Sequence, residues 1–218
     1  MRLETVRRVL VWSSLVRTLH WAMALGVVTL VASGWLILRA PAELGAGAAE
    51  VHRNMGYLLL AALAARVYLL LFGRGGEQWR DFLPWPPQHR AAGQMLRFYL
   101  TLGRSPLPAY YAHNPLWGPI YLAFFAVLMA QGVTGLLGLM GWHRLGLSVV
   151  TVFVVLHVLA VFLHDWKGSG ADVSAMINGH RVFVVNRPQA TGPAGVHVVS
   201  VDSVLPRKPG AGKRPEQG

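Results

Sequence analysis

The segment between Arg144 and Asp165 constrains the fold most strongly. Its 20 residues contain only two ionisable side chains, His157 and His164. A helix of about 20 apolar residues is long enough to cross the hydrocarbon core of a bilayer, which is about 30 Å thick. An imidazole inside a bilayer is costly unless something binds it, so a histidine in such a helix is a candidate functional residue. The alternative for His157 taken alone is a hydrogen-bonded histidine without a ligand.

The composition is that of a membrane protein. The chain has 218 residues, of which 54% are hydrophobic and only 13% are charged, whereas a soluble domain has about 25% charged residues. The net charge of +11 lies mainly outside the apolar runs. Membrane topology accounts for this charge better than nucleic-acid binding does, so we expect no nucleic-acid partner. The absence of cysteine excludes disulfides, Fe–S clusters, thiolate zinc sites and a haem c attachment motif.

Three further apolar runs accompany this segment. The basic start before the first run would suit a signal peptide, but the run is too long for one, and no clear cleavage site follows. We therefore interpret it as a retained span. The fold class predicted is an all-α membrane protein, a bundle of four transmembrane helices over residues 18–38, 52–72, 115–139 and 142–163.

The connections between the helices differ in charge. An even number of spans places both termini on one side of the membrane. That side carries 16 Lys and Arg residues, in the first 17 residues, in a polar, Pro-rich connection over residues 73–114 and in the tail from Asp165. The other side carries three, in a short Ala/Gly loop over residues 39–53 and at Arg144. Because Lys and Arg favour the cytoplasmic side, we expect both termini in the cytoplasm and, in a bacterial inner membrane, the short loops in the periplasm.

The end of the chain differs from the rest. We expect a membrane domain over residues 1–166 and a short cytoplasmic C-terminal tail over residues 167–218, partly disordered. In this tail, residues 172–179 suggest a short interfacial helix, and residues 181–185 and 196–201 suggest two short strands.

Four histidines fall into pairs by depth. His20 lies near the cytoplasmic end of the first helix, and His52 and His143 lie at the periplasmic starts of the second and fourth helices. His157 is 14 residues after His143, which corresponds to about 21 Å of helix rise and about 40° of rotation, so both lie on one face. His52 therefore pairs with His143, and His20 with His157. Ligation by two histidines from two helices is typical of haem b, so we predict two haems, whereas a zinc site needs three or four ligands at one depth.

Two arginines and a further histidine accompany the predicted haem ligands. Arg66 and Arg17 are each placed to pair with the propionates of the cytoplasmic haem, although simple snorkelling to the membrane interface explains each equally well. His164 is seven residues after His157 and shares its face. It is an alternative cytoplasmic ligand, but it stands next to Asp165 at the helix end, so we favour His157.

Six segments carry a resemblance to a known family. The chain resembles the b-type cytochrome subunit of membrane-bound nickel–iron hydrogenases, within the bacterial cytochrome b561-like superfamily. The histidine positions are shared more widely, including with gamma subunits of formate dehydrogenases and with stand-alone cytochromes. The matching segments are VRTLHW (16–21), HRNMGYLLLAALAARVYL (52–69), YYAHNPL (110–116), GWHRLGL (141–147), VVLHVLAVFLHD (154–165) and SAMINGHR (174–181).

The resemblance implies an electron-transfer subunit rather than a complete enzyme. A periplasmic Fe–S subunit, with its catalytic subunit, would supply electrons to the periplasmic haem, and the cytoplasmic haem would reduce menaquinone or ubiquinone. Family precedent places the quinone near the start of the third helix, where His113 and Asn114 match. Asn114 before Pro115 is equally explained as a helix N-cap. The short connection over residues 139–142 departs from the hydrogenase pattern and leaves the identity of the partner open, so another quinone-linked complex or a stand-alone oxidoreductase is an alternative. A haem-free anchor that only tethers a partner is a separate alternative.

Overall fold

Four long apolar helices dominate the structure, which is a computed structural model. It describes residues 5–85, 88–108, 110–167 and 172–185. The helices are long and apolar enough to cross a membrane, which confirms the four predicted spans and a multi-pass membrane protein. They are α1 (Ser14–Arg39), α2 (Ala42–Phe72), α4 (Trp117–Leu136) and α5 (Met140–Lys167).

The start of α2 lies ten residues before the predicted one. The Ala/Gly loop predicted over residues 39–53 is wrong, because the helix already begins at Ala42. The segment after Pro41 is rich in alanine, the strongest helix former, and proline is well tolerated where a helix begins. Only Ala40 and Pro41 separate α1 from α2, so these two helices form an antiparallel hairpin.

The long connection after α2 contains more structure than its prolines suggest. Two 3-10 turns, η1 (Gly75–Glu77) and η2 (Trp79–Phe82), are followed by the helix α3 (Gln88–Leu100). Met95 and Phe98, three residues apart, are the buried face of α3. Its exposed positions include Arg90 and Arg97 and also the apolar Leu96 and Leu100.

The core of the bundle is a layer of aliphatic side chains in which all four long helices take part. Its buried members are Met23, Val27, Leu59, Leu63, Leu128 and Val150. Many large apolar side chains on the outer faces of the helices are instead exposed, among them Leu58, Leu159 and Phe162. In a four-span protein these outer faces are the ones that lipid covers.

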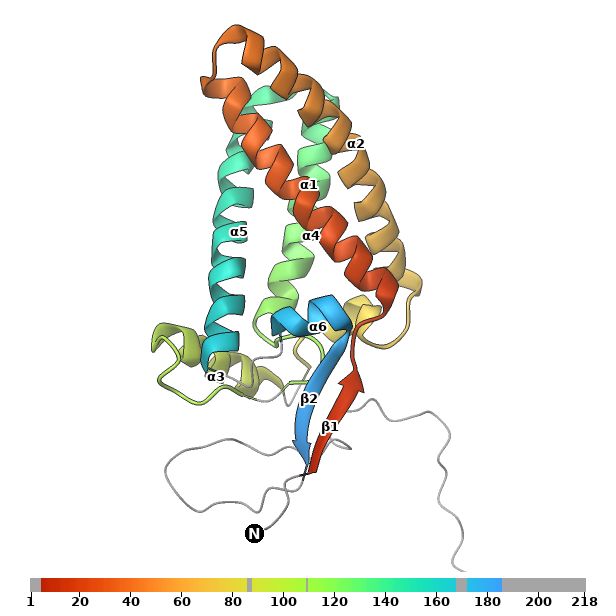
Figure 1. The fold of residues 1–218 in the computed structure, drawn as a ribbon, viewed down its shortest axis with the longest axis vertical. Coiled ribbons are helices and arrows are strands. Elements are labelled where there is room, and N and C mark those ends of the chain that lie inside the picture. The colour runs from red at the N-terminus through yellow and green to blue at the C-terminus, as the bar shows by residue number, and fades with distance from the viewer. Residues whose placement is uncertain (1–4, 86–87, 109, 168–171, 186–218) are drawn as a thin grey trace, which may run out of the picture.

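The two ends of the bundle are built differently (Figure 1). The α1–α2 and α4–α5 connections form one end, and α3, a short helix α6 (Asp172–Asn178) and two strands form the other. The strands β1 (Thr5–Leu10) and β2 (His180–Val185) pair antiparallel, with Thr5 opposite Val185 and Leu10 opposite His180. This end therefore joins the beginning of the described chain to its end.

The predicted tail elements agree with α6 and β2, which are both confirmed. The partner strand β1 is not predicted, and the second predicted strand, over residues 196–201, lies outside the described residues, as does the stretch predicted to be disordered. The division of the chain at residue 166 and the side of the membrane on which the strands lie stay predictions.

Candidate functional site

The first histidine pair lies toward the end of the bundle away from the strands. His52 from α2 and His143 from α5 have ring centroids 5.9 Å apart, with their planes at 82°. Two imidazoles that bind one metal ion at about 2 Å each have centroids about 6 Å apart. The structure thus brings these rings to the separation of a bis-histidine metal site.

Hydrogen bonds fix which nitrogen of each ring carries the proton. Ser33 Oγ donates to the carbonyl of Thr29 at 2.7 Å, so it accepts from His52 Nδ1 at 2.9 Å. His143 Nδ1 lies 3.1 Å from the carbonyl of Gln131, which can only accept. Both rings therefore carry hydrogen on Nδ1 and keep an unprotonated Nε2, the form that binds a metal. Within the described chain neither Nε2 has a hydrogen-bond partner.

Glycines let neighbouring helices pass close to both rings. A Cβ atom at Gly34 of α1 would lie 3.5 Å from His52 Cε1, and one at Gly135 of α4 would lie 3.1 Å from His143 Cε1. A larger side chain at Gly135 would press on the imidazole and displace it. These two positions therefore help to keep the rings where they face each other.

The second histidine pair lies toward the strand end of the bundle. His20 from α1 and His157 from α5 have ring centroids 6.3 Å apart, with their planes at 63°. This is again the separation expected when two imidazoles bind one metal ion. Phe153 stacks on His157 at 5.8 Å, and Tyr121 Oη lies 3.3 Å from His157 Nδ1.

A cavity of about 430 Å³ adjoins the second pair. Many of its lining residues are aromatic, with Trp117, Tyr121 and Phe153 among them. A flat aromatic cofactor or a quinone ring suits such walls. The cavity brings together five of the predicted site residues, namely His20, His157, Arg66, His113 and Asn114.

Arg66 is buried in the wall of this cavity rather than extended to the membrane surface. Its side chain lies over the rings of Phe82, at 5.2 Å, and Phe125, at 5.6 Å, and the residue is 5% exposed. Within the described residues its guanidinium makes one hydrogen bond, from Nη1 to the carbonyl of Glu77 at 3.2 Å. A guanidinium has five N–H donors, so most of them are free for an anionic group in the cavity.

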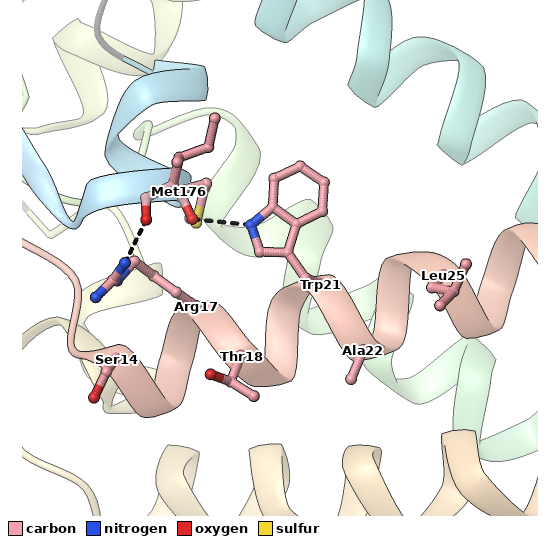
Figure 2. A pocket seen from close by; sticks show the side chains of 8 residues that line it. Ser14, Arg17, Thr18, Trp21, Ala22, Leu25 and Met176 are labelled. Atoms are coloured by element: carbon pink, nitrogen blue, oxygen red, sulfur yellow. Dashed lines mark hydrogen bonds between the residues drawn. The ribbon is translucent and has the colours of Figure 1, made fainter.

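Arg17 does not line this cavity and lies in the groove that Figure 2 shows. It lines an open groove between α1 and α6, together with Trp21 and Met176. Its Nη1 donates to the carbonyl of Ile177, and Trp21 Nε1 donates to the carbonyl of Met176 at 2.9 Å. A cation at the C-terminus of a helix is favourable, so Arg17 holds α6 against α1. Its Nε is buried without a hydrogen-bond partner among the described residues.

His113 is a neutral side chain held between aromatic rings. Phe82 lies 3.7 Å from the imidazole centroid, and Trp12 lies 4.9 Å away. Burial lowers the pKa of His113 to about 4, and the positive charges of Arg66 and Arg181 act in the same direction. Its Nε2 donates to the carbonyl of Gly76 at 2.7 Å, which leaves Nδ1 as the acceptor.

Asn114 lies three residues before the first residue of the third membrane helix, α4. Its Oδ1 accepts from the backbone N–H groups of Leu116, at 2.9 Å, and Trp117, at 3.3 Å. Such bonds satisfy amide groups that have no partner in the first turn of a helix. The side-chain amide nitrogen donates in turn to Tyr99 Oη at 3.1 Å. Asn114 therefore has a capping role and also points a donor toward the cavity wall.

His164 is part of a polar cluster that the sequence analysis does not predict. Its Nε2 lies 2.7 Å from Tyr99 Oη, and its Nδ1 lies 2.9 Å from Asp172 Oδ2. With both nitrogens hydrogen-bonded, His164 has none free for a metal, which favours His157 as the ligand. Tyr110 and Arg181 complete the cluster. Both lie in segments that carry the family resemblance. Tyr99 lies in α3, a helix that is hard to predict because prolines precede it.

Comparisons with known proteins match most of the chain. The profile described as prokaryotic cytochrome b561 matches residues 11–179. A probable Ni/Fe-hydrogenase B-type cytochrome subunit of Azotobacter vinelandii is 30% identical, over 85% of this chain and 94% of its own. One of Cupriavidus necator is 29% identical, over 83% and 89%, and a hydrogenase 1 subunit of Escherichia coli is 23% identical, over 78% and 89%. No solved structure matches the chain.

Proposed function

The chain belongs to the prokaryotic cytochrome b561 family, and on that premise we propose that it is the dihaem b-type membrane subunit of a quinone-linked oxidoreductase. In this role it takes electrons from an Fe–S subunit on one side of the membrane and passes them to a quinone near the other side. The names of its curated relatives support a Ni/Fe hydrogenase as the source of electrons.

One observation carries this proposal. Two pairs of imidazoles face each other with centroids 5.9 and 6.3 Å apart, each pair from two different helices. One helix, α5, supplies His143 to one pair and His157 to the other, separated by about 21 Å of helix rise. Electron transfer between the pairs would thus cross much of the low-dielectric core.

The chain's own residues would hold and orient each cofactor. Haem b, when bound, supplies a carrier that takes up and releases one electron. His52 and His143 would ligate one haem through Nε2, with Ser33 and the carbonyl of Gln131 fixing the orientation of the rings. His20 and His157 would ligate the other, beside the aromatic cavity.

The cavity would also hold the reacting end of the quinone. Asn114 Nδ2 is placed to donate to a quinone carbonyl, and the unprotonated His113 Nδ1 to accept a proton. The buried guanidinium of Arg66 has free donors and would pair with the propionates of the adjacent haem. The apolar walls exclude water around these groups. Menaquinone and ubiquinone both fit this chemistry.

The topology follows from charge. We place the strand end of the bundle in the cytoplasm of a bacterial inner membrane, because 16 Lys and Arg residues belong to segments on that side and three to the other. The hydrogenase would then dock on the periplasmic end, near His52 and His143. A reporter fused after residue 218 that is active only in the periplasm should stay silent.

The test begins with the complex purified from the membrane in mild detergent. We expect two haem b per chain in a pyridine haemochrome assay, reduction of both by hydrogen, and reduction of an added quinone. A complex that is fully loaded with cofactor but contains only one haem b per chain, or none, would contradict the proposal. Co-purification with a formate dehydrogenase, or activity without any partner, would identify instead a gamma-type subunit or a stand-alone oxidoreductase. The three-residue α4–α5 connection, which offers a partner little surface, makes this control necessary.

A further inference from the structure

Three polar side chains from three elements meet beside the cavity and have no place in the proposed ligand sets. Tyr99 comes from α3, His164 from the end of α5 and Asp172 from the start of α6. All three line the cavity next to His20 and His157. They form one hydrogen-bonded row, in which Tyr99 Oη lies 2.7 Å from His164 Nε2 and His164 Nδ1 lies 2.9 Å from Asp172 Oδ2.

The direction of each hydrogen bond follows from the neighbours of Tyr99. Trp117 Nε1 can only donate, and it lies 2.8 Å from Tyr99 Oη. Asn114 also donates to this oxygen through Nδ2, because its Oδ1 already accepts from the backbone of α4. With both lone pairs used, the hydroxyl hydrogen of Tyr99 points at His164 Nε2. His164 then carries its own hydrogen on Nδ1 and donates to Asp172.

Asp172 is ionised and reaches solvent. Burial alone would raise the pKa of Asp172, but the hydrogen bond from His164 and the charge of Arg181 outweigh burial and hold it below its usual value. Arg181 Nη2 lies 2.5 Å from Oδ1, and Tyr110 donates to Oδ2 at 2.8 Å. The Asp172 side chain is 21% exposed, so this end of the row contacts water.

The charged groups around His164 carry an excess of negative charge. Asp165, on the same helix, is a second carboxylate, which accepts the backbone N–H groups of Asp172 and Val173. Arg181 from β2 supplies one positive charge against these two negative charges. The groups that face His164 from the other elements, Tyr99 and Tyr110, are both neutral, since burial raises the pKa of each phenol. The groups that surround the ring therefore carry a net charge of −1, from Asp165, Asp172 and Arg181.

We propose that Tyr99, His164 and Asp172 form a proton relay that serves the quinone cavity, with Tyr99 as the group that hands over the proton. This inference rests on the proposed function, which supplies the quinone and its two electrons. When His164 is doubly protonated, its Nε2–H takes the place of Asn114, the longer of the two donors to Tyr99 Oη at 3.1 Å, and the phenolic hydrogen points into the cavity.

The steps balance for each of the two protons that a quinone needs. The O–H bond of Tyr99 breaks as an O–H bond forms on the reduced quinone. At the same time the Nε2–H bond of His164 breaks and a new O–H bond forms on Tyr99, so no free tyrosinate has to form. His164 becomes neutral, which is the state that the hydrogen bonds of the structure describe. Nδ1 still carries its hydrogen, so the imidazole must turn to bring the unprotonated Nε2 to the water on the exposed side of Asp172, take up the next proton there and turn back.

The test uses the purified complex with its electron donor. Tyr99→Phe removes the hydroxyl and keeps the ring, so both haems should remain and be reduced at the wild-type rate. Quinone reduction should fall about tenfold to a hundredfold, because positioned proton transfer contributes at least that much. Tyr111→Phe is the matched control, since the Tyr111 ring stacks on Phe183 and its hydroxyl makes no hydrogen bond within the described residues. Asp172→Asn should slow quinone reduction in the same way as Tyr99→Phe.

Two further measurements separate a relay from a structural role. In His164→Ala, added imidazole should restore quinone reduction, whereas an equal concentration of salt should not. Incorporation of difluorotyrosine at position 99, which keeps the shape and lowers the phenol pKa, should shift the pH profile of quinone reduction. An unchanged pH profile, together with a wild-type rate in Tyr99→Phe, would overturn the relay and leave the proposed function intact. A wild-type complex that reduces its haems but no quinone would overturn both.

Discussion

Ser33 Oγ accepts a hydrogen bond from His52 Nδ1 at 2.9 Å, across the contact between α1 and α2. The same hydroxyl donates to the carbonyl of Thr29, so Ser33 fixes both the tautomer and the orientation of the His52 ring. A partner of this kind behind a metal-binding histidine is worth about tenfold to a hundredfold in affinity.

Ser33→Ala should therefore weaken the haem at the His52–His143 pair without unfolding the bundle. We expect partial loss of one haem of the two in the pyridine haemochrome assay, and faster loss of that haem to an apo-globin acceptor. Ser148→Ala, an exposed serine on α5, is the control and should retain both haems. Equal haem retention in the two variants would show that the hydroxyl does not support the ligand.

The ligand assignment on α5 can be tested with three alanine variants. His143→Ala and His157→Ala should each lose one haem, and each should keep the other. His164→Ala should keep both, because its two nitrogens are already bonded to Tyr99 and Asp172. Absorption spectra and redox titration of the purified variants would measure this. If His157→Ala keeps two haems and His164→Ala loses one, the assignment is reversed.

Depth in the membrane made the histidine pairs predictable. A straight helix has a fixed rise per residue, so the position of His143 and of His157 along α5 follows from the sequence once the span is recognised. Because α1 and α2 run in opposite directions, His52 lies at the depth of His143, and His20 lies at the depth of His157. The structure agrees, with rings 5.9 and 6.3 Å apart in the expected combinations.

The polar cluster around His164, at the strand end of the bundle, could not be predicted in the same way. Its members lie on α3, α5, α6 and β2, and only the folding of the connections brings them together. The six-residue strand β1 has no alternating apolar pattern, and its pairing with β2 joins residues 170 to 180 positions apart in the sequence. The amphipathic face of α3, with Met95 and Phe98 buried, follows a Pro-rich stretch that predicts an irregular loop.

Acid should destabilise the protein through His113. The pKa of His113 is about 4 in the fold, against 6.5 for an ordinary histidine, so below pH 6.5 the unfolded chain binds the proton more tightly. Stability is therefore complete above pH 6.5 and is lost as the pH falls toward 4. At pH 5 the loss is up to about 2 kcal/mol, since one pKa unit corresponds to about 1.4 kcal/mol.

The measurement is the thermal midpoint in detergent at pH 7.5 and at pH 5. His113→Gln keeps a donor for the carbonyl of Gly76 but cannot titrate, so its midpoint should fall less between the two pH values. Asp172 does not interfere, because its pKa is held below 3.8 and its stabilising effect is lost only at lower pH. The same fall in wild type and His113→Gln would rule out His113 as the cause.

The two roles of Asn114 can be separated by its two side-chain ends. Oδ1 caps α4 through the N–H groups of Leu116 and Trp117, while Nδ2 donates toward the cavity through Tyr99. Asn114→Ala removes both and should cost about 1 kcal/mol of stability as well as activity. Asn114→Asp keeps the acceptor at a helix N-terminus, where a negative charge is favourable, and loses the donor. It should therefore recover the thermal midpoint but not the rate of quinone reduction, with both haems retained. Recovery of the rate as well would mean that Asn114 acts only as a helix cap and that the quinone is bound by other groups of the cavity.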